Sequence, residues 1–178
     1  MIFVTVGTQL PFPRLIEAVD RYAAEFGEPV VAQVGQDHEP RQHIETHDMI
    51  PPQRFDELFR SARVIVAHAG IGTILSAKKY LRPLVVMPRR HDLGEHRNDH
   101  QLATVRHLGN VTGIHVAQDC ADLFALLSQP CLTPPSDTLG QSHIALLDTL
   151  SDFLRTAGPA AAASLGPPAE VAPNPNEE

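Results

Sequence analysis

The chain has 178 residues, 43% of them hydrophobic, and a formal net charge of −7. This length and composition are typical of one globular core domain. The negative charge, without a cluster of arginine or lysine, argues against a nucleic-acid partner. The two cysteines, Cys120 and Cys131, lack the spacing of a zinc or redox motif, which fits a reducing cytoplasm.

Strands alternate with helices along the chain. Short apolar runs bounded by glycine or proline predict the strands, and apolar residues at helical spacing predict the helices. The pattern predicts strands at 2–6, 29–34, 64–67, 84–87 and 111–116, with a further short strand considered at 48–50, and helices at 15–26, 55–62, from 73 onward, 95–108, 120–127 and 140–154. This alternation predicts an α/β fold, a Rossmann-like parallel sheet with helices on both faces.

The end of the chain differs in composition from the rest. Residues 156–178 are mainly alanine, proline and acidic residues without an apolar face, so we expect a disordered tail after a domain at 1–155. No segment approaches the roughly 20 apolar residues that cross a bilayer, and no basic signal region opens the chain. We therefore expect any membrane contact to be peripheral and to depend on a partner.

The turn after the strand at 64–67 contains the first candidate site, His68-Ala-Gly-Ile-Gly-Thr73. In a parallel sheet, ligands bind at the carboxyl ends of the strands, where the next helix offers unpaired N–H groups to an anion. Gly70 and Gly72 would let a phosphate approach the backbone, while Thr73 would cap the helix or donate its hydroxyl. The alternative is a tight turn without a ligand, in which Thr73 only caps the helix.

A second polar loop, MPRRHDLGEHRNDHQLA, follows the strand at 84–87. Arg89 and Arg90 can neutralise a diphosphate. The side chains suited to the hydroxyls of a sugar are Glu95, Asn98 and Gln101. The alternative is a solvated helix start with Glu95 in its first turn.

The same loop also permits a metal site. His96 and His100 are four residues apart on one predicted helical face, and Asp92, Glu95 and Asp99 are nearby. This spacing alone is a weak signal for zinc, because no third ligand stands at a known spacing. We expect no resident metal.

Three motifs in the same order give the chain a family resemblance. IFVTVGTQLPFPRLI, HAGIGTILSA followed by RPLVVMPRR, and GEHRNDHQLA together resemble the donor-binding half of GT-B glycosyltransferases, the C-terminal domain of glycosyltransferase family 28. The opening is similar to the small catalytic subunit of the eukaryotic enzyme that adds N-acetylglucosamine to a dolichol-linked sugar. The two later motifs are still more similar to bacterial exopolysaccharide subunits of glucuronosyltransferase type.

The resemblance implies a UDP-sugar donor, with its diphosphate at the turn of residues 68–73 and its uracil and ribose against the strand ends. His68 and Arg89 would stabilise the leaving group, and no metal or other cofactor is implied. Ser76 occupies the position where the family often has a glutamate that holds the ribose hydroxyls. The implied donor-binding residues are Gly7, Thr8, His68, Ala69, Gly70, Ile71, Gly72, Thr73, Ser76, Arg89, Glu95, Asn98 and Gln101.

The resemblance also implies that this chain supplies one of the two domains of a GT-B enzyme. The acceptor-binding domain and the general base would then belong to another chain, which in the resembled families is membrane-anchored and acts on a lipid-linked saccharide acceptor. We expect inverting, metal-independent transfer by a heteromer in exopolysaccharide synthesis, and the sequence leaves homo-oligomer formation open. The alternatives are a non-catalytic nucleotide-sugar-binding regulatory or scaffold subunit, and a single-domain nucleotide enzyme of different chemistry.

Overall fold

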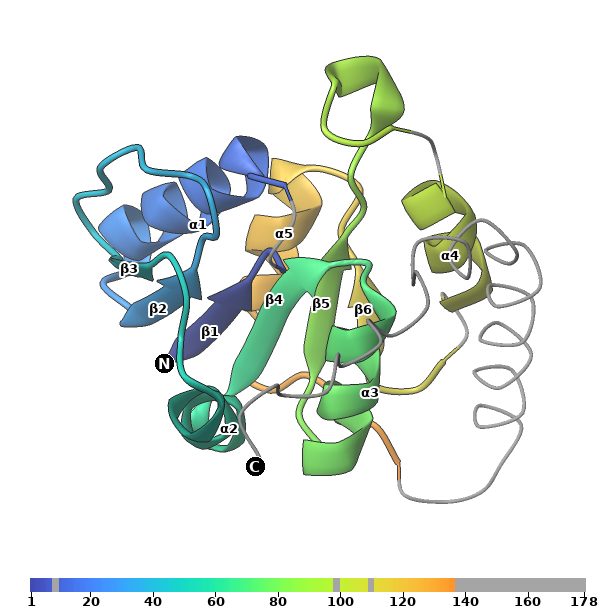
Figure 1. Cartoon of the computed structure of the whole chain (residues 1–178). Helices are drawn as coiled ribbons and strands as arrows, with labels where there is room; N and C mark the ends of the chain where they lie inside the picture. Colours follow the sequence, from blue (N-terminus) through green and yellow to red (C-terminus); the bar gives the residue numbers. More distant parts are fainter. Residues whose placement is uncertain (8–9, 98–99, 109–110, 137–178) are drawn as a thin grey trace, which may run out of the picture.

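The computed structural model describes residues 1–7, 10–97, 100–108 and 111–136 (Figure 1). In this part of the chain, parallel strands form one six-stranded sheet in the order β3-β2-β1-β4-β5-β6. The strands are β1 (Ile2–Thr5), β2 (Val30–Gln33), β3 (Glu45–His47), β4 (Val64–His68), β5 (Leu84–Met87) and β6 (Ile114–Val116). The predicted Rossmann-like parallel sheet is confirmed.

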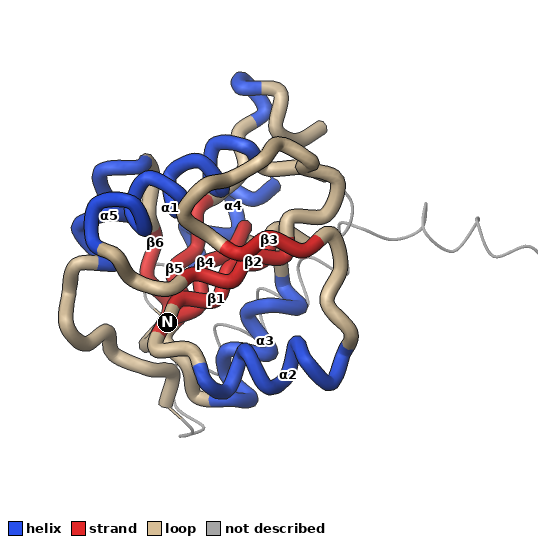
Figure 2. The backbone as a smooth tube through the Cα atoms, turned by 90° about the vertical axis from the view of Figure 1, so that its left-hand side faces the viewer, coloured by secondary structure: helices blue, strands red, loops and turns tan. Residues whose placement is uncertain are grey.

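Helices cover both faces of this sheet (Figure 2). They are α1 (Pro13–Phe26), α2 (Pro52–Ser61), α3 (Ile71–Tyr80), α4 (His100–Leu108) and α5 (Cys120–Leu127), with a 3-10 turn η1 (His91–Leu93) before α4. The central strands are apolar on both faces, so alternate side chains enter two separate cores. Ile2 and Val4 of β1 pack in the core with α1 and α5, whereas Phe3 packs in the core with α2, α3 and α4.

The chain changes direction across the sheet at β1. This strand pairs with β2 on one side and with β4 on the other, and Thr5 aligns with both Gln33 and Ala67. The helices that follow β1 and β4 leave toward opposite faces, so the loops at the carboxyl ends of these strands diverge. Such a switch point is where open α/β sheets bind their ligands.

Most predicted strands and helices differ from the observed ones by up to three residues at their ends, as where β6 begins at Ile114 and α2 at Pro52, and three differences matter for the fold or the site. The third strand lies at Glu45–His47 and not at 48–50; its side chains are exposed at the sheet edge, so they carry no apolar pattern. The helix expected from Thr73 already begins at Ile71. The helix expected at 95–108 begins at His100, because the preceding turn ends at Gly94 in a left-handed conformation.

Several predictions fall outside the described residues. The helix at 140–154, the domain boundary at 155 and the tail at 156–178 are among them, so they stay predictions. In the part of the chain that is described, no helix combines the length and the apolar character needed to cross a membrane.

Candidate functional site

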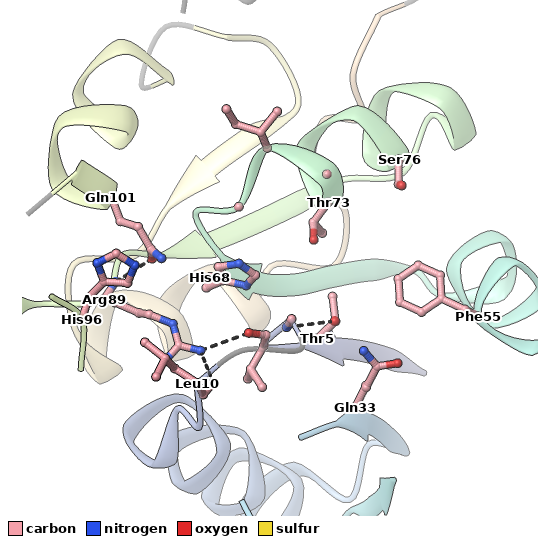
Figure 3. Close-up of a pocket in the computed structure, with 15 residues that line it drawn as sticks. Thr5, Leu10, Gln33, Phe55, His68, Thr73, Ser76, Arg89, His96 and Gln101 are labelled. Carbon is pink, nitrogen blue, oxygen red and sulfur yellow. Dashed lines mark hydrogen bonds between the residues drawn. The ribbon is translucent and has the colours of Figure 1, made fainter. Parts of the chain in front are cut away.

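A cavity of about 510 Å³ lies at the carboxyl ends of the central strands (Figure 3). Its volume is within the range of roughly 300–1,000 Å³ that small-molecule sites occupy. The lining residues come from the ends of β1, β2, β4 and β5, from the loops after β1 and β5, and from α2, α3 and α4: Thr5, Val6, Gly7, Leu10, Gln33, Phe55, His68, Gly70, Ile71, Gly72, Thr73, Ser76, Arg89, His96 and Gln101. The cavity therefore occupies the switch point of the fold.

The first turn of α3 forms one wall of the cavity. Gly70 is the N-cap residue and makes no side-chain cap, so Thr73 does not cap the helix as the sequence had suggested. The N–H groups of Ile71, Gly72 and Thr73 precede the first intrahelical bond, which Ile74 donates to Gly70. All three residues line the cavity. These N–H groups and the helix dipole therefore present partial positive charge to it.

The imidazole of His68 lies between two glycines that come from different strands. A Cβ on Gly7, which has a positive φ of 78°, would come within 2.9 Å of His68 Cε1. A Cβ on Gly70 would overlap the ring itself. Gly72 is different, because a Cβ there would meet nothing within 4 Å. Gly7 and Gly70 thus make room for His68, whereas Gly72 leaves open space beside the start of the helix.

The environment of His68 favours the neutral imidazole. Burial lowers its pKa to about 4, the positive charges of Arg89 and His96 act in the same direction, and a backbone hydrogen bond with Thr5 acts against them. Within the described residues, His68 Nδ1 is buried without a hydrogen-bond partner. The imidazole therefore lines the cavity through other ring atoms, beside the unpaired N–H groups of α3.

We expect the stability of the domain to fall between pH 6.5 and pH 4 because of His68. The unfolded chain takes up a proton near pH 6.5, while the folded protein does not until about pH 4. The loss is on the order of 2 to 3 kcal/mol. Urea unfolding at several pH values, with His68→Gln for comparison, measures it. The prediction would be contradicted if the free energy of unfolding depended on pH equally in the wild-type and His68→Gln proteins.

Arg89 connects β5 to the loop that follows β1. The residue is 2% exposed, and its guanidinium donates through Nη2 to the carbonyls of Val6 (3.0 Å) and Leu10 (2.6 Å). Nη1 donates to the carbonyls of Pro11 and Glu95. Burial lowers the pKa of Arg89 to about 10, and Glu95 opposes that decrease. Its terminal nitrogens thus donate to four backbone carbonyls, and the neutralisation of a diphosphate by Arg89 stays a prediction.

Glu95 makes contacts that the sequence analysis did not predict. Its carboxylate forms a bidentate ion pair with Arg14, with Nε to Oε1 at 2.6 Å and Nη2 to Oε2 at 2.8 Å. Oε2 also accepts from the backbone N–H of Arg90 at 2.9 Å. Glu95 is absent from the described lining of the cavity. In this structure its carboxylate joins the loop after β5 to the start of α1, and a contact with the donor sugar stays a prediction.

Comparison with known families agrees with this geometry. The sequence pattern of the glycosyltransferase family 28 C-terminal domain matches residues 1–129. The chain belongs to this family. No curated protein matches the sequence significantly.

Solved structures of low sequence identity share the fold of this family 28 domain. The calicheamicin glycosyltransferase CalG4 is 21% identical with a TM-score of 0.52, and the match covers 91% of this chain and 41% of CalG4. A UDP-glucose:anthocyanidin 3-O-glucosyltransferase in complex with UDP is 15% identical with a TM-score of 0.55, over 93% of this chain and 36% of the enzyme. ALG13 is 19% identical with a TM-score of 0.53, over 87% of this chain and 93% of ALG13. This chain therefore corresponds to one half of a GT-B fold.

The family 28 domain brings most of the predicted donor-binding residues to the cavity. Those that line it are Gly7, His68, Gly70, Ile71, Gly72, Thr73, Ser76, Arg89 and Gln101. Ala69 is different, because it is 5% exposed and packs in the core with α3. Thr8 and Asn98 lie outside the described residues. That the lining residues bind a donor stays a prediction.

Two further polar side chains of the second loop make contacts within the protein. Arg90 pairs with Asp92, with Nη2 to Oδ2 at 2.6 Å, and both side chains are exposed. Gln101 Oε1 accepts from the backbone N–H of Arg89 at 3.0 Å, while the residue lines the cavity. Gln101 is therefore placed at the cavity, whereas Arg90 is directed to the surface of the family 28 domain.

The alternative of a metal site at His96 and His100 finds no third ligand among the described residues. Among the described residues, no group of three or more His, Cys, Asp or Glu side chains is arranged to hold a metal ion. The side chain of His100 lies outside the description. His96 instead lines the cavity, where the sequence analysis had considered it only as a metal ligand.

Other lining residues were missed by the sequence analysis: Thr5, Val6, Leu10, Gln33 and Phe55. Gln33 offered a usable signal, because it is a polar residue at the end of an otherwise apolar strand. Phe55 offered none, since an aromatic residue at helical spacing is equally typical of a core position. It does pack against the core, and it also faces the cavity of the family 28 domain.

Proposed function

We propose that this chain is the donor-binding subunit of an inverting UDP-sugar-dependent glycosyltransferase. The observation that carries the proposal is a cavity whose hydrogen-bond donors lack acceptors. The N–H groups at the start of α3 have no acceptor in the described part of the chain, and the imidazole of His68 lines the cavity beside them. A diphosphate supplies the acceptor oxygens and the negative charge that suit such a site.

The proposed reaction is attack by an acceptor hydroxyl on the anomeric carbon, from the face opposite the diphosphate. The new glycosidic bond forms as the bond between the anomeric carbon and the diphosphate oxygen breaks, and negative charge moves to UDP. The N–H groups of Ile71, Gly72 and Thr73 stabilise that charge. Arg89 adds positive potential without direct contact, because its terminal nitrogens bond to backbone carbonyls.

A general base for the acceptor hydroxyl is proposed to come from a partner chain. None of the described residues that line the cavity is a carboxylate. The chain also spans only 41% of CalG4 and 36% of the anthocyanidin glucosyltransferase, and we propose that a separate polypeptide supplies the second half of such a cleft. We propose a membrane-anchored subunit that binds a lipid-linked saccharide acceptor. The motif GEHRNDHQLA, similar to that of exopolysaccharide subunits, supports a role in exopolysaccharide synthesis.

We further propose that the reaction needs no metal ion. The sequence contains no Asp-x-Asp motif of the kind that holds a metal against a nucleotide diphosphate. The first turn of α3 offers three N–H groups for the charge that a metal would otherwise neutralise.

The low pKa of His68, about 4, makes it a weak base, and together with the lack of a carboxylate in the described lining this favours one alternative function. A subunit that only binds the nucleotide sugar, and so regulates or supports its partner, needs the donor cavity but no base. It would bind UDP with the same residues and show no turnover in any combination of subunits. Binding alone therefore cannot separate the two functions, and turnover must be measured.

The test is reconstitution with a candidate membrane-anchored, Rossmann-like partner chain, to be sought first among the neighbouring reading frames. We expect UDP release from a UDP-sugar only when both chains and a lipid-linked acceptor are present, and we expect equal rates with and without excess EDTA. The His68→Gln protein should be slower, because it lacks the imidazole beside the diphosphate.

Three outcomes would contradict parts of this proposal. Efficient acceptor-dependent transfer by the isolated chain would refute the need for a second half. Loss of activity in EDTA, reversed by Mg²⁺, would refute metal independence. UDP binding without turnover in the reconstituted pair would favour the regulatory alternative.

A further inference from the structure

The cavity has two chemically different sides, which Figure 3 shows around His68. Arg89, His96 and Gln101 lie on one side, and Gln33 and Phe55 lie on the other. The first side contains positive charge. The second contains an amide and an aromatic ring, neither of which is needed to bind a diphosphate.

Gln33 is held in one orientation by the backbone. It is the last residue of β2 and is 6% exposed. Its Oε1 accepts from the N–H of Ile50 at 3.0 Å, and because a backbone N–H is a donor, the atom that faces it must be the amide oxygen. The Nε2 group therefore has a fixed position. Within the described residues Nε2 has no hydrogen-bond partner, and it is not among the polar atoms sealed from solvent.

Phe55 is supported from behind by other aromatic rings. Its ring contacts Phe3 edge to face with centroids 5.1 Å apart, and contacts Phe59 at 5.7 Å. Phe3 and Phe59 are fully buried, whereas Phe55 is only half-buried and lines the cavity. The ring is thus fixed by the core and still accessible to a planar ligand.

We infer that Gln33 and Phe55 recognise the nucleobase of the donor, with Gln33 Nε2 donating to a carbonyl oxygen of the base and Phe55 contacting the base surface. This inference rests on the proposed function. Ser76 lies on the same side of the cavity as Gln33 and Phe55, and it belongs to α3, at whose start the diphosphate is proposed to bind (Figure 3). The ribose would then lie near Ser76, between the base and the diphosphate. A fixed N–H donor favours uracil, which has two carbonyl oxygens, over adenine, which has none.

The test compares UDP with ADP, because the two share the ribose and the diphosphate. Gln33→Glu keeps an oxygen for the N–H of Ile50 and removes the donor. Any effect of the new charge on the diphosphate is common to both nucleotides, so it cancels in the ratio of their dissociation constants. We expect the preference for UDP over ADP to fall about tenfold in calorimetric titrations.

A matched control is available on the other side of the cavity. Gln101 also lines the cavity and also accepts a backbone N–H through Oε1, from Arg89. Gln101→Glu adds the same charge without touching the proposed base site, so it should weaken UDP and ADP equally. Phe55→Leu should weaken UDP several-fold and leave inorganic pyrophosphate binding unchanged. Melting temperatures of all variants establish that they are folded.

The possible results separate this inference from the proposed function. The inference would be overturned if Gln33→Glu left the ratio of the UDP and ADP dissociation constants unchanged. It would also be overturned if Gln101→Glu changed that ratio by the same factor as Gln33→Glu. A wild-type protein that binds both nucleotides equally would do the same. If the wild-type protein binds neither UDP nor ADP, the proposed function itself fails.

Discussion

Replacing Gly72 by valine is expected to weaken UDP binding about 100-fold without unfolding the domain. Gly72 is in the first turn of α3 and lines the cavity, and a Cβ there meets no protein atom within 4 Å. The valine methyl groups would therefore occupy the space of the diphosphate. Losing two charge-assisted hydrogen bonds, at about 1.5 kcal/mol each, gives this factor.

The stability of the Gly72→Val protein distinguishes loss of a ligand site from loss of fold. Valine is more favourable than glycine inside a helix by about 0.4 kcal/mol, so thermal stability should be equal or slightly higher. Leu75→Ala is a suitable control, because Leu75 lies on the same helix, is 45% exposed and is not part of the described lining. Calorimetric titration with UDP measures the effect. Wild-type affinity in Gly72→Val would refute the placement of the diphosphate.

Replacing Arg89 by methionine should lower the free energy of unfolding by about 4 kcal/mol. The substitution leaves the carbonyls of Val6, Leu10 and Pro11 without a donor, and each unsatisfied buried group costs about 1 to 3 kcal/mol. It also removes a cation–π contact of the guanidinium carbon with Phe12, at 4.5 Å from the ring centroid. Because domains are stable by only about 5 to 15 kcal/mol, this loss is large.

Arg89→Lys separates the structural role from a direct role in binding the diphosphate. Lysine keeps the charge but cannot reach several carbonyls in fixed directions. If Arg89 acts mainly by organising the loop after β1, urea unfolding should show both variants destabilised. Nearly wild-type stability of Arg89→Lys, together with weak UDP binding, would instead favour direct contact with the ligand.

The strands of the central sheet were predictable because their side chains are apolar on both faces. Val64 to Ala67 and Leu84 to Met87 are uninterrupted apolar runs, and both are buried in the structure. The edge strand Glu45–His47 was not predictable in the same way. Its exposed polar side chains are ordered by backbone pairing with β2 alone, and that pairing leaves no pattern in the sequence.

The start of α3 shows a second limit of prediction from the sequence. Gly70 and Gly72 have low helix propensity, so the sequence placed the helix start at Thr73, after both of them. In the structure Gly72 is already helical and Gly70 is the N-cap residue. The packing of Ile74 and Ala77 against the sheet stabilises the first turn, which local propensity does not report.

Site residues that belong to one continuous motif were easier to predict than residues that are far apart in the sequence and meet only in the fold. The turn at 68–73 directly follows β4, and Gln101 stands at the start of the helix that follows β5, so the topology brings both to the cavity. The ion pair of Glu95 was not predictable, because Arg14, which binds its carboxylate, is 81 positions away. Gln33 and Phe55 reach the cavity only through the folding of β2 and α2 around β1.

The contact of His68 with Gly7 and Gly70 restricts how this turn can diverge in evolution. An alanine at either glycine requires the imidazole to move, and a small residue in place of histidine removes the ring that packs between the two glycines. Each single substitution therefore passes through a less stable protein, although a paired change such as Gly70→Ala with His68→Ser removes the clash. The three positions are under epistasis, and lineages that alter one of them should alter another as well.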